Sequence, residues 1–211
     1  MSESKRIKIA KRVAQELNEG DVINLGIGIP TLIPDYIGEK VVFLQSENGL
    51  LGMGPTPKEE DTDMDLISAS KRPITMEPGA SIFDSADSFA MIRGGHIDLA
   101  VLGTLQVDET GKVANWSIPG ANILGVGGAM DLVVGAKRII IATTHLTKDD
   151  KPKIVKELTY PSSGDRKVDM VVTEHAVFEF KKGEMYLTER LSDISLQELA
   201  DITDASYKTL L

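Results

Sequence analysis

The sequence contains no cysteine. Disulfides, thiolate–metal sites and a cysteine nucleophile are therefore excluded, and covalent chemistry has to use another side chain. The sequence also lacks an excess of basic residues, because 23 Lys and Arg stand against 32 Asp and Glu and the formal net charge is −9, with no basic run to offset it. Such a surface repels phosphate backbones and anionic lipid, so we expect neither nucleic acid nor a membrane as a partner.

Long apolar runs are missing as well. No stretch approaches the roughly 18 uninterrupted apolar residues of a membrane span, and the first ten residues lack the apolar core of a signal peptide. We therefore expect a cytoplasmic protein. Its 211 residues contain no Pro- or Ser-rich linker, and 42% of them are hydrophobic. This length and composition predict one globular domain over residues 1–211.

Apolar periodicity alternates between helical and strand-like segments along the chain. Helices are predicted over residues 3–19, 30–37, 85–92, 129–137 and 195–201, the last after a Ser195 cap. Strands are predicted over residues 22–25, 41–44, 65–68, 99–105, 139–143 and 170–173. A hairpin is predicted over residues 176–180 and 185–188, around the turn at Lys182-Gly183. The alternation predicts an α/β fold with an open, mostly parallel sheet, helices on both faces and a hairpin near the C-terminus.

A glycine turn, Gly26-Ile27-Gly28, follows the first predicted strand. It lacks the third glycine of the dinucleotide fingerprint, because Thr31 stands in that place, so NAD binding is disfavoured. The alternative is a tight turn at the carboxyl end of a parallel strand, where open sheets bind ligands. Gly26 and Gly28 are therefore candidate binding residues.

Three histidines, His96, His145 and His175, lie far apart in the sequence and lack metal-ligand spacing. We expect them to be structural or exposed, and we expect no metal site. No Gly-x-Ser-x-Gly motif is present, so a serine hydrolase is poorly supported.

Glu47 is a carboxylate at the end of an apolar strand, beside the glycine-rich segment 49–54. One interpretation is structural, with Glu47 capping a following helix or pairing with a lysine; the other is a nucleophile. A second glycine-rich stretch, residues 120–131, leads into a predicted helix, so its backbone N–H groups could face an anionic centre, although paired glycines also form simple turns. Together the two segments supply a carboxylate and oxyanion donors, which acyl transfer requires.

Several motifs follow one another along nearly the whole chain: Ser46-Glu47-Asn48-Gly49, Leu51-Gly52-Met53-Gly54-Pro55, Pro78-Gly79-Ala80-Ser81, Phe89-Ala90-Met91-Ile92-Arg93-Gly94-Gly95-His96, Ala114-Asn115-Trp116, Ile118-Pro119-Gly120 and Gly127-Gly128-Ala129-Met130-Asp131-Leu132-Val133. In this order and spacing the sequence resembles the family I coenzyme A transferases. Within that family it is similar to the β subunits of 3-oxoacid (acetoacetate-type) CoA-transferases.

The resemblance implies that Glu47 is the covalent nucleophile and that the backbone amide of Gly128 contributes to the oxyanion hole. Lys71 matches a family lysine near the active site, although its neighbours differ from the family pattern. The residues expected on the coenzyme A side of the site are Gly127, Lys71, Asn48, Gly26 and Gly28.

The resemblance also implies a ping-pong exchange of coenzyme A between an acyl-CoA and a free carboxylic acid, through a glutamyl-CoA thioester. Coenzyme A is then a substrate and no further cofactor is expected. A separate α subunit of the same fold completes the site in this family, which implies an α2β2 heterotetramer. The acyl group (succinyl, acetyl, butyryl or a 3-oxoacyl group such as acetoacetyl) stays open. Two alternatives also stay open: an acyl-CoA hydrolase on the same site, and a non-catalytic sensor or regulatory subunit of related fold.

Overall fold

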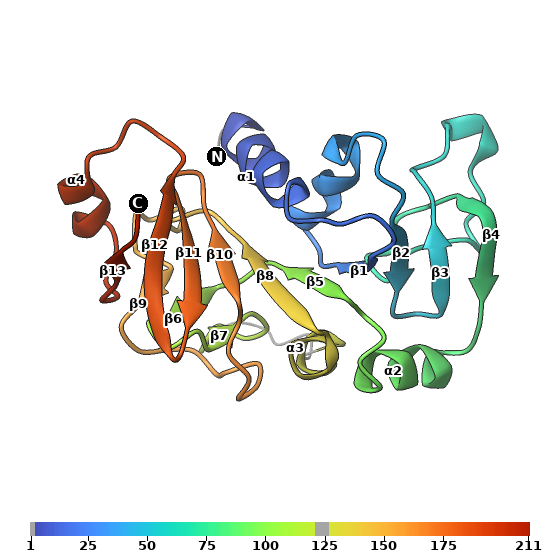
Figure 1. The fold of residues 1–211 in the computed structure, drawn as a ribbon. Helices are drawn as coiled ribbons and strands as arrows, with labels where there is room; N and C mark the ends of the chain where they lie inside the picture. Colours follow the sequence, from blue (N-terminus) through green and yellow to red (C-terminus); the bar gives the residue numbers. More distant parts are fainter. Residues whose placement is uncertain (1–2, 121–126) are drawn as a thin grey trace.

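The computed structural model describes residues 3–120 and 127–211, which form a mixed α/β fold around a ten-stranded sheet (Figure 1). In spatial order the strands of this sheet are β13 (Lys208–Thr209), β12 (Glu184–Arg190), β11 (Ala176–Lys181), β10 (Met170–Val172), β8 (Arg138–Ala142), β5 (Leu99–Leu102), β1 (Val22–Leu25), β2 (Phe43–Ser46), β3 (Leu50–Met53) and β4 (Met76–Ile82). A three-stranded sheet contains β7 (Val113–Ala114), β6 (Gln106–Asp108) and β9 (Ile154–Val155). The helices are α1 (Glu3–Ala14), α2 (Ser85–Arg93), α3 (Ala129–Gly135) and α4 (Leu196–Asp201), with 3-10 turns η1 (Pro30–Tyr36) and η2 (Glu59–Asp61).

The middle of the large sheet is parallel, as the alternation of elements predicts. The strands β10, β8, β5, β1 and β2 pair in parallel, whereas β11 and β12 on one flank and β3 and β4 on the other pair antiparallel. The carboxyl ends of parallel strands meet at one edge of a sheet, and ligands of open sheets bind there. The segments after β1 and after β2 therefore share one edge.

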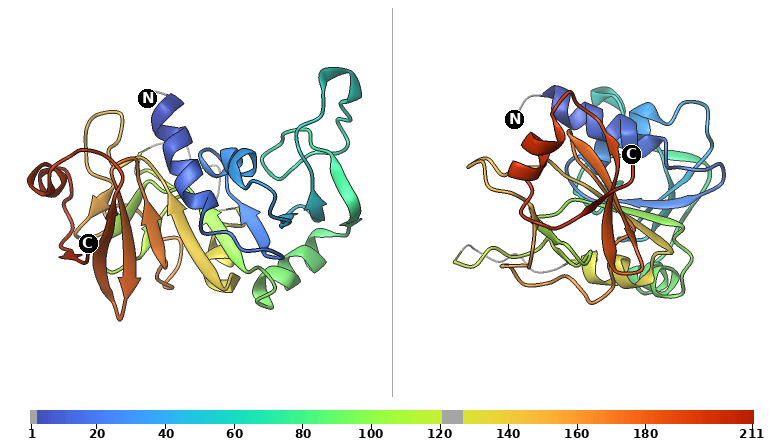
Figure 2. Two further views of the ribbon diagram at one scale, coloured as in Figure 1. Left: turned by 45° about the horizontal axis from the view of Figure 1, so that its top comes forward. Right: turned by 60° about the vertical axis from the view of Figure 1, so that its left-hand side comes forward.

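Both faces of the parallel region are covered, because alternate side chains of each strand enter different cores. In β8, Ile140 packs with Ile9 and Val13 of α1, whereas Ile139 packs with Leu132 of α3, on the opposite face. The right-hand view of Figure 2 shows α1 above the sheet, and α2 and α3 below it. The predicted layers are thus confirmed.

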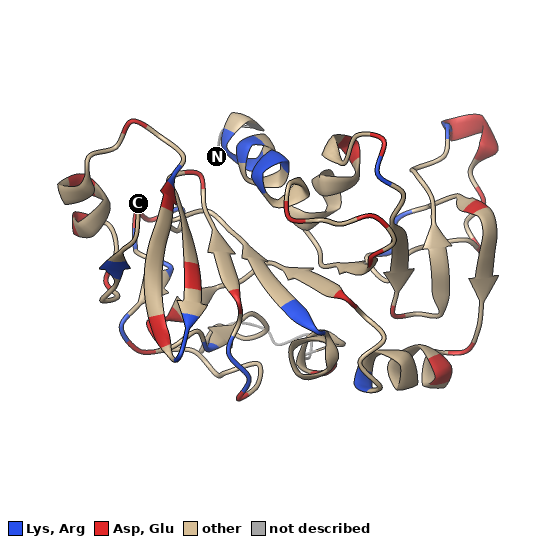
Figure 3. Ribbon diagram, in the orientation of Figure 1, with Lys and Arg blue, Asp and Glu red and all other residues tan. Residues whose placement is uncertain are grey.

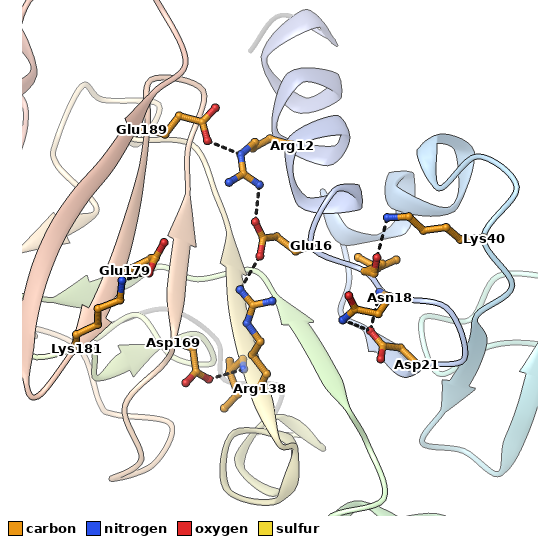
Figure 4. A network of polar contacts seen from close by, with 12 residues as sticks. Arg12, Glu16, Asn18, Asp21, Lys40, Arg138, Asp169, Glu179, Lys181 and Glu189 are labelled. Carbon is orange, nitrogen blue, oxygen red and sulfur yellow. Dashed lines mark hydrogen bonds and ion pairs between the residues drawn. The ribbon is translucent and has the colours of Figure 1, made fainter. Parts of the chain in front are cut away.

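An ion-pair network fastens α1 to the sheet (Figure 4). Arg12 donates hydrogen bonds of 2.7 Å to Glu16 on one side and to Glu189 of β12 on the other. Glu16 also accepts a 2.6 Å hydrogen bond from Arg138 of β8. The helix is therefore held by charged groups as well as by its apolar face.

The helix predicted over residues 3–19 ends at Ala14. Its last turn tightens because the N–H of Glu16 bonds to the carbonyl of Val13. The carboxylate of Asp21 then accepts hydrogen bonds from both the backbone and the side chain of Asn18. Such local bonds compete with helix formation, so the segment folds as a turn although its apolar spacing continues.

Other predicted boundaries also change. The helix predicted over residues 30–37 is instead the 3-10 turn η1, which ends at Tyr36, since Pro34 lacks the N–H that an α-helix needs there. Residues 65–68 are not a strand, because Ile67 makes only an isolated bridge to Pro73. The strand predicted at 99–105 ends at Leu102 as β5, and β6 begins only at Gln106. The strand predicted at 41–44 begins two residues later as β2. The C-terminal hairpin is confirmed, and so is the Ser195 cap, which forms a capping box with Glu198.

Basic side chains are unevenly spread over the fold. Lys and Arg concentrate on α1 (Figure 3), which holds five of them: Lys5, Arg6, Lys8, Lys11 and Arg12. Lys5 pairs with the buried Glu174 at 3.1 Å, so part of this charge is neutralised within the chain. Within the described ranges, no helix combines the length and apolar character needed to cross a bilayer.

Candidate active site

Glu47 lies in the three-residue turn that joins β2 to β3, at the carboxyl edge of the parallel strands. The hairpin pairs Ser46 with Leu50, which leaves Glu47, Asn48 and Gly49 to reverse the chain. Gly49 has a φ of +119°, and a Cβ built on it would overlap the carbonyl oxygen of Phe83. The turn therefore depends on a glycine at this position.

The turn is also tied to the loop that follows η2. Asn48 donates a 2.7 Å hydrogen bond to the carbonyl of Ile67, and Ser46 Oγ accepts one from the N–H of Ala69. These bonds fix the backbone on both sides of Glu47. Asn48, which we expected to bind coenzyme A, thus uses its amide group within the protein.

The side chain of Glu47 is half-buried and points toward β1. Asn24 of β1 pairs in register with Gln45 of β2, and its Nδ2 donates a 3.1 Å hydrogen bond to Glu47 Oε2. The ion pairs formed within residues 3–120 and 127–211 do not include Glu47, and the element after it is a strand, not a helix to be capped. Among the described residues, neither form of the structural interpretation of this carboxylate is therefore realised.

Gly128 reaches the same place from a distant part of the chain. A Cβ built on Gly128 would lie 3.4 Å from Cγ of Glu47 and 3.3 Å from Cζ of Phe89. The turn at Gly128 is held by α2, because Arg93 donates a 2.7 Å hydrogen bond to Asp131 of α3. Gly127 adopts a φ of +58° next to it. Gly125 and Val126 of the same glycine-rich stretch lie outside the described residues.

A cavity of about 850 Å³ opens beside Glu47. Its size falls within the range of small-molecule sites. Gly26 and Glu47 lie on its wall, and the remaining lining is mostly apolar, including Leu25, Val41, Phe43, Leu51, Met53 and Ile74. The N–H of Gly26 bonds to the carbonyl of Val101, and a Cβ at this position would approach that oxygen to a crowded 3.2 Å.

Two other predicted binding residues lie beside the cavity rather than on its wall, as far as the described residues define it. Gly28 has a φ of +99° and its carbonyl accepts a 2.8 Å hydrogen bond from Thr31, so it shapes the turn into η1. Lys71 is exposed at the tip of a turn with a φ of +60°, whereas its neighbour Arg72 lines the cavity.

Asn24 and Arg72 are site residues that the sequence did not predict. Asn24 is the polar residue in the otherwise apolar run of β1, and that position next to a glycine turn is a signal that could have identified it. Arg72 had no such signal, because only the fold of this turn determines that Arg72, and not the adjacent Lys71, lines the cavity.

The histidines take no part in this site. His145 is fully buried, with its ring nitrogens 3.2 Å from Thr173 Oγ1 and 2.9 Å from Thr203 Oγ1. Burial lowers its pKa to about 4, so the ring is neutral at pH 7. This environment fits the structural role that the sequence predicts.

Comparisons with known proteins agree with the fold and extend it. The family model "Coenzyme A transferase" matches residues 6–201. The chain is 50% identical to a subunit of the probable succinyl-CoA:3-ketoacid coenzyme A transferase of Bacillus subtilis, covering 96% of this chain and 94% of that protein. It is 49% identical to the beta subunit of the acetate CoA-transferase of Escherichia coli K12, covering 95% and 92%.

Among solved structures, an acyl-CoA transferase apoenzyme from Escherichia coli O157:H7 superposes with a TM-score of 0.78 at 24% identity. That match covers 98% of this chain but only 42% of the other chain. The fold is therefore shared with one part of a longer protein. The family model matches most of the sequence, and the two relatives share about half of their residues with this chain over nearly their full length. This chain therefore belongs to the coenzyme A transferase family.

Proposed function

We propose that this chain is the subunit that carries the nucleophile of a 3-oxoacid-type coenzyme A transferase, and that Glu47 is this nucleophile. The observation that carries the proposal is the position of its carboxylate, free of ion pairs within the described residues, between the Asn24 amide, Gly128 and the 850 Å³ cavity. An unpaired carboxylate at a cavity mouth suits attack on a neutral carbonyl carbon.

In the proposed first half-reaction, a carboxylate oxygen of Glu47 attacks the thioester carbonyl of an acyl-CoA. The C–S bond breaks, and an acyl-glutamyl anhydride and the coenzyme A thiolate form. The thiolate then attacks the glutamyl carbonyl carbon, the anhydride C–O bond breaks, and the acyl group leaves as a free carboxylate. The glutamyl-CoA thioester that remains reacts with the second acid by the same steps in reverse. Coenzyme A is a substrate, and the chemistry needs no further cofactor.

Gly128 is the proposed oxyanion donor, through its backbone N–H. Its position beside Cγ of Glu47 supports this role, because the tetrahedral intermediates form at the carbonyl that the Glu47 oxygen attacks and then at the Glu47 carboxyl carbon itself. Loss of one oxyanion donor typically costs about 10²–10³ in rate. On the coenzyme A side we propose Gly26 and Gly127, and we favour Arg72 over Lys71 because Arg72 lines the cavity and Lys71 does not.

The proposed substrates are short-chain acyl-CoA thioesters and carboxylic acids. The names of the relatives support this class, since one relative is named for succinyl-CoA and a 3-ketoacid and another for acetate. The choice among them depends on differences of about 1–3 kcal/mol per methylene group. The cytoplasmic location expected from the sequence stays a prediction.

A partner protein is the other part of the proposal. Both relatives are named as single subunits of their enzymes, and the longer acyl-CoA transferase chain has more than twice this chain's length. Large apolar side chains are exposed around β2 and β4, namely Ile27, Phe43, Met76 and Ile82. Exposed apolar groups that gather near a site mark a contact with another protein. We propose an α subunit as that protein, in an α2β2 assembly.

The test is intact-mass spectrometry of this chain, co-expressed with the α subunit, after brief exposure to acetoacetyl-CoA without an acceptor acid. We expect a coenzyme A adduct that maps to Glu47, and no adduct and no exchange in Glu47→Gln or Glu47→Ala. Glu39→Gln, which changes an exposed carboxylate away from the cavity wall, is the matched control and keeps wild-type exchange.

Two outcomes would contradict the proposal. Wild-type exchange in Glu47→Ala removes the nucleophile assignment. Steady release of coenzyme A by the wild-type complex without an acceptor, and without an adduct, identifies a hydrolase instead.

A further inference from the structure

A chain of buried polar side chains runs from Glu47 into the interior. Asn24 of β1, Gln45 of β2 and Ser88 of α2 are 1%, 2% and 0% exposed. Asn24 Nδ2 donates a 2.7 Å hydrogen bond to Gln45 Oε1, and Gln45 Nε2 donates a 2.7 Å hydrogen bond to Ser88 Oγ. Buried polar groups of this kind need a reason, because an apolar residue would pack there at lower cost.

The chemistry of the partners determines which way each amide points. Asn24 faces two atoms that can only accept, the backbone carbonyl of Gln45 at 3.3 Å and the carboxylate of Glu47 at 3.1 Å. Its Nδ2 group must therefore face them, since an amide oxygen there would be repelled. Gln45 must in turn present Oε1 to that Nδ2 and Nε2 to Ser88, whose hydroxyl accepts.

This orientation has a cost at Asn24. Its Oδ1 is buried and has no hydrogen-bond partner within residues 3–120 and 127–211. A buried acceptor without a donor is uncommon and calls for an explanation. The reverse orientation would direct Oδ1 at the Glu47 carboxylate. The observed orientation instead keeps Nδ2 hydrogen-bonded to Glu47 and leaves Oδ1 without a donor among the described residues.

We propose that Gln45 is a positioning residue for the nucleophile. Held by Ser88, it fixes the Asn24 amide, and Asn24 in turn holds the carboxylate of Glu47 toward Gly128. The residue Gln45 lies on the cavity wall, but its side-chain amide bonds to Asn24 and Ser88 and not to Glu47. The inference rests on the proposed role of Glu47. Because Asn24, Gln45 and Ser88 are buried and hydrogen-bonded, the carboxylate is oriented before substrate arrives, which reduces the reorganisation needed for attack.

The variant that tests this is Gln45→Met, which keeps the approximate size of the side chain and removes both of its hydrogen bonds. Gln106→Met is the matched control. Gln106 is also a buried strand glutamine with hydrogen bonds at both ends of its amide, but its partner is Thr159, and its strand belongs to the small sheet. Both variants lose buried hydrogen bonds, so both should lower the melting temperature. Only Gln45→Met breaks the hydrogen-bonded connection to Glu47.

We measure single-turnover formation of the coenzyme A adduct, together with kcat and KM, in the complex with the α subunit. Gln45→Met should lower the adduct rate and kcat about 10- to 100-fold, the scale of loss for a small misplacement of a reacting group, with KM for acyl-CoA little changed. Gln106→Met should leave all three near wild type. Equal kinetics in the two variants would overturn the proposal, because the loss would then be structural alone.

Ser88→Ala adds a test of the chain itself. It should lower kcat less than Gln45→Met does, and it should cost nothing further when combined with Gln45→Met, because the connection is already broken. Additive losses would remove Ser88 from the chain.

A crystal structure of Gln45→Met gives a readout that does not depend on activity. We expect the Asn24 side chain, without its 2.7 Å hydrogen bond to Gln45 Oε1, to shift and its contact with Glu47 Oε2 to lengthen beyond hydrogen-bond distance. A contact that stays at 3.1 Å would overturn the positioning role even if wild-type activity confirms the transferase. An absent wild-type adduct would instead overturn the proposed function, while this crystallographic comparison would still decide the role of Gln45.

Discussion

At the scale of single residues, Gly49 does most to place Glu47. It stands two residues after the nucleophile candidate, with a φ of +119°, against the carbonyl of Phe83, which follows β4 directly. A larger residue would push β2–β3 away from α2, and with it Glu47 away from Gly128. The Ser-Glu-Asn-Gly motif is therefore a steric requirement as well as a chemical one.

Gly49→Ala should accordingly destabilise the fold by about 1–3 kcal/mol, because the new Cβ overlaps backbone atoms that cannot move aside. Denaturant unfolding measures this. Gly20→Ala is the control, since Gly20 has a φ of +82° but open space around it. The control measures the free-energy cost of a positive φ at an alanine, and the additional cost in Gly49→Ala then measures the steric overlap. If Gly49→Ala costs no more than Gly20→Ala, the overlap is relieved elsewhere.

At the scale of elements, α2 connects the two halves of the site. Its Ser88 binds Gln45 behind the nucleophile, its Phe89 packs against Gly128, and its Arg93 holds Asp131 at the start of α3. Residues close together on one helix thus contact both β2 and α3. A small shift of α2 would therefore change the distance between Glu47 and Gly128.

The attachment of α1 is the element-scale feature that depends on pH. Burial disfavours the ionised form of Glu16, but hydrogen bonds from Arg12 and Arg138 outweigh it and lower the pKa of Glu16 below its ordinary value. A carboxyl group with a lowered pKa in the folded state stabilises the fold above its unfolded-state pKa. That contribution is lost as the pH falls through the folded-state pKa.

Glu16→Gln should therefore lower the free energy of unfolding at pH 7, and the difference from wild type should shrink to zero as the solution is acidified through that range. Chemical denaturation at a series of pH values measures both. Glu157→Gln, at an exposed carboxylate, is the control and should follow wild type throughout. A difference between Glu16→Gln and wild type that does not change with pH would assign the effect to packing.

At the scale of the whole molecule, charge and exposed apolar surface both indicate that the chain works in a complex. Its net charge is −9, and its main basic concentration is on α1 (Figure 3), which contacts η1, β8 and β10. Coenzyme A brings several negative charges of its own. A second subunit that supplies cationic groups would reduce this repulsion.

The isolated chain should therefore show no exchange activity, whereas the co-expressed complex should be active. Sedimentation measurements on both preparations, alongside the exchange assay, test this and give the stoichiometry. Robust turnover by the purified chain alone, at the mass of a monomer, would contradict the need for a partner.

Much of the fold follows from local patterns. The strand at 22–25 matches β1, and the Ser195 cap and the hairpin at 176–188 are observed, because hydrophobic period, capping and turn residues act within a few positions. The errors also have local causes. Turn bonds at Asn18 end α1 early, and the bridge from Ile67 to Pro73 replaces a predicted strand. In both places a competing hydrogen bond overrides the apolar period.

The sequence by itself determined the family and the candidate nucleophile, since both depend on residue types in order along the chain. Only the tertiary structure decided which of those residues meet. Gly128 lies near Glu47 because α2 bonds to both β2 and α3. Arg72 instead of Lys71 lines the cavity because of one turn, and Gln45 connects Asn24 to Ser88 across three elements. The physical reason is that spacing in sequence sets local conformation, whereas distances between remote side chains arise only when the two cores pack against the sheet.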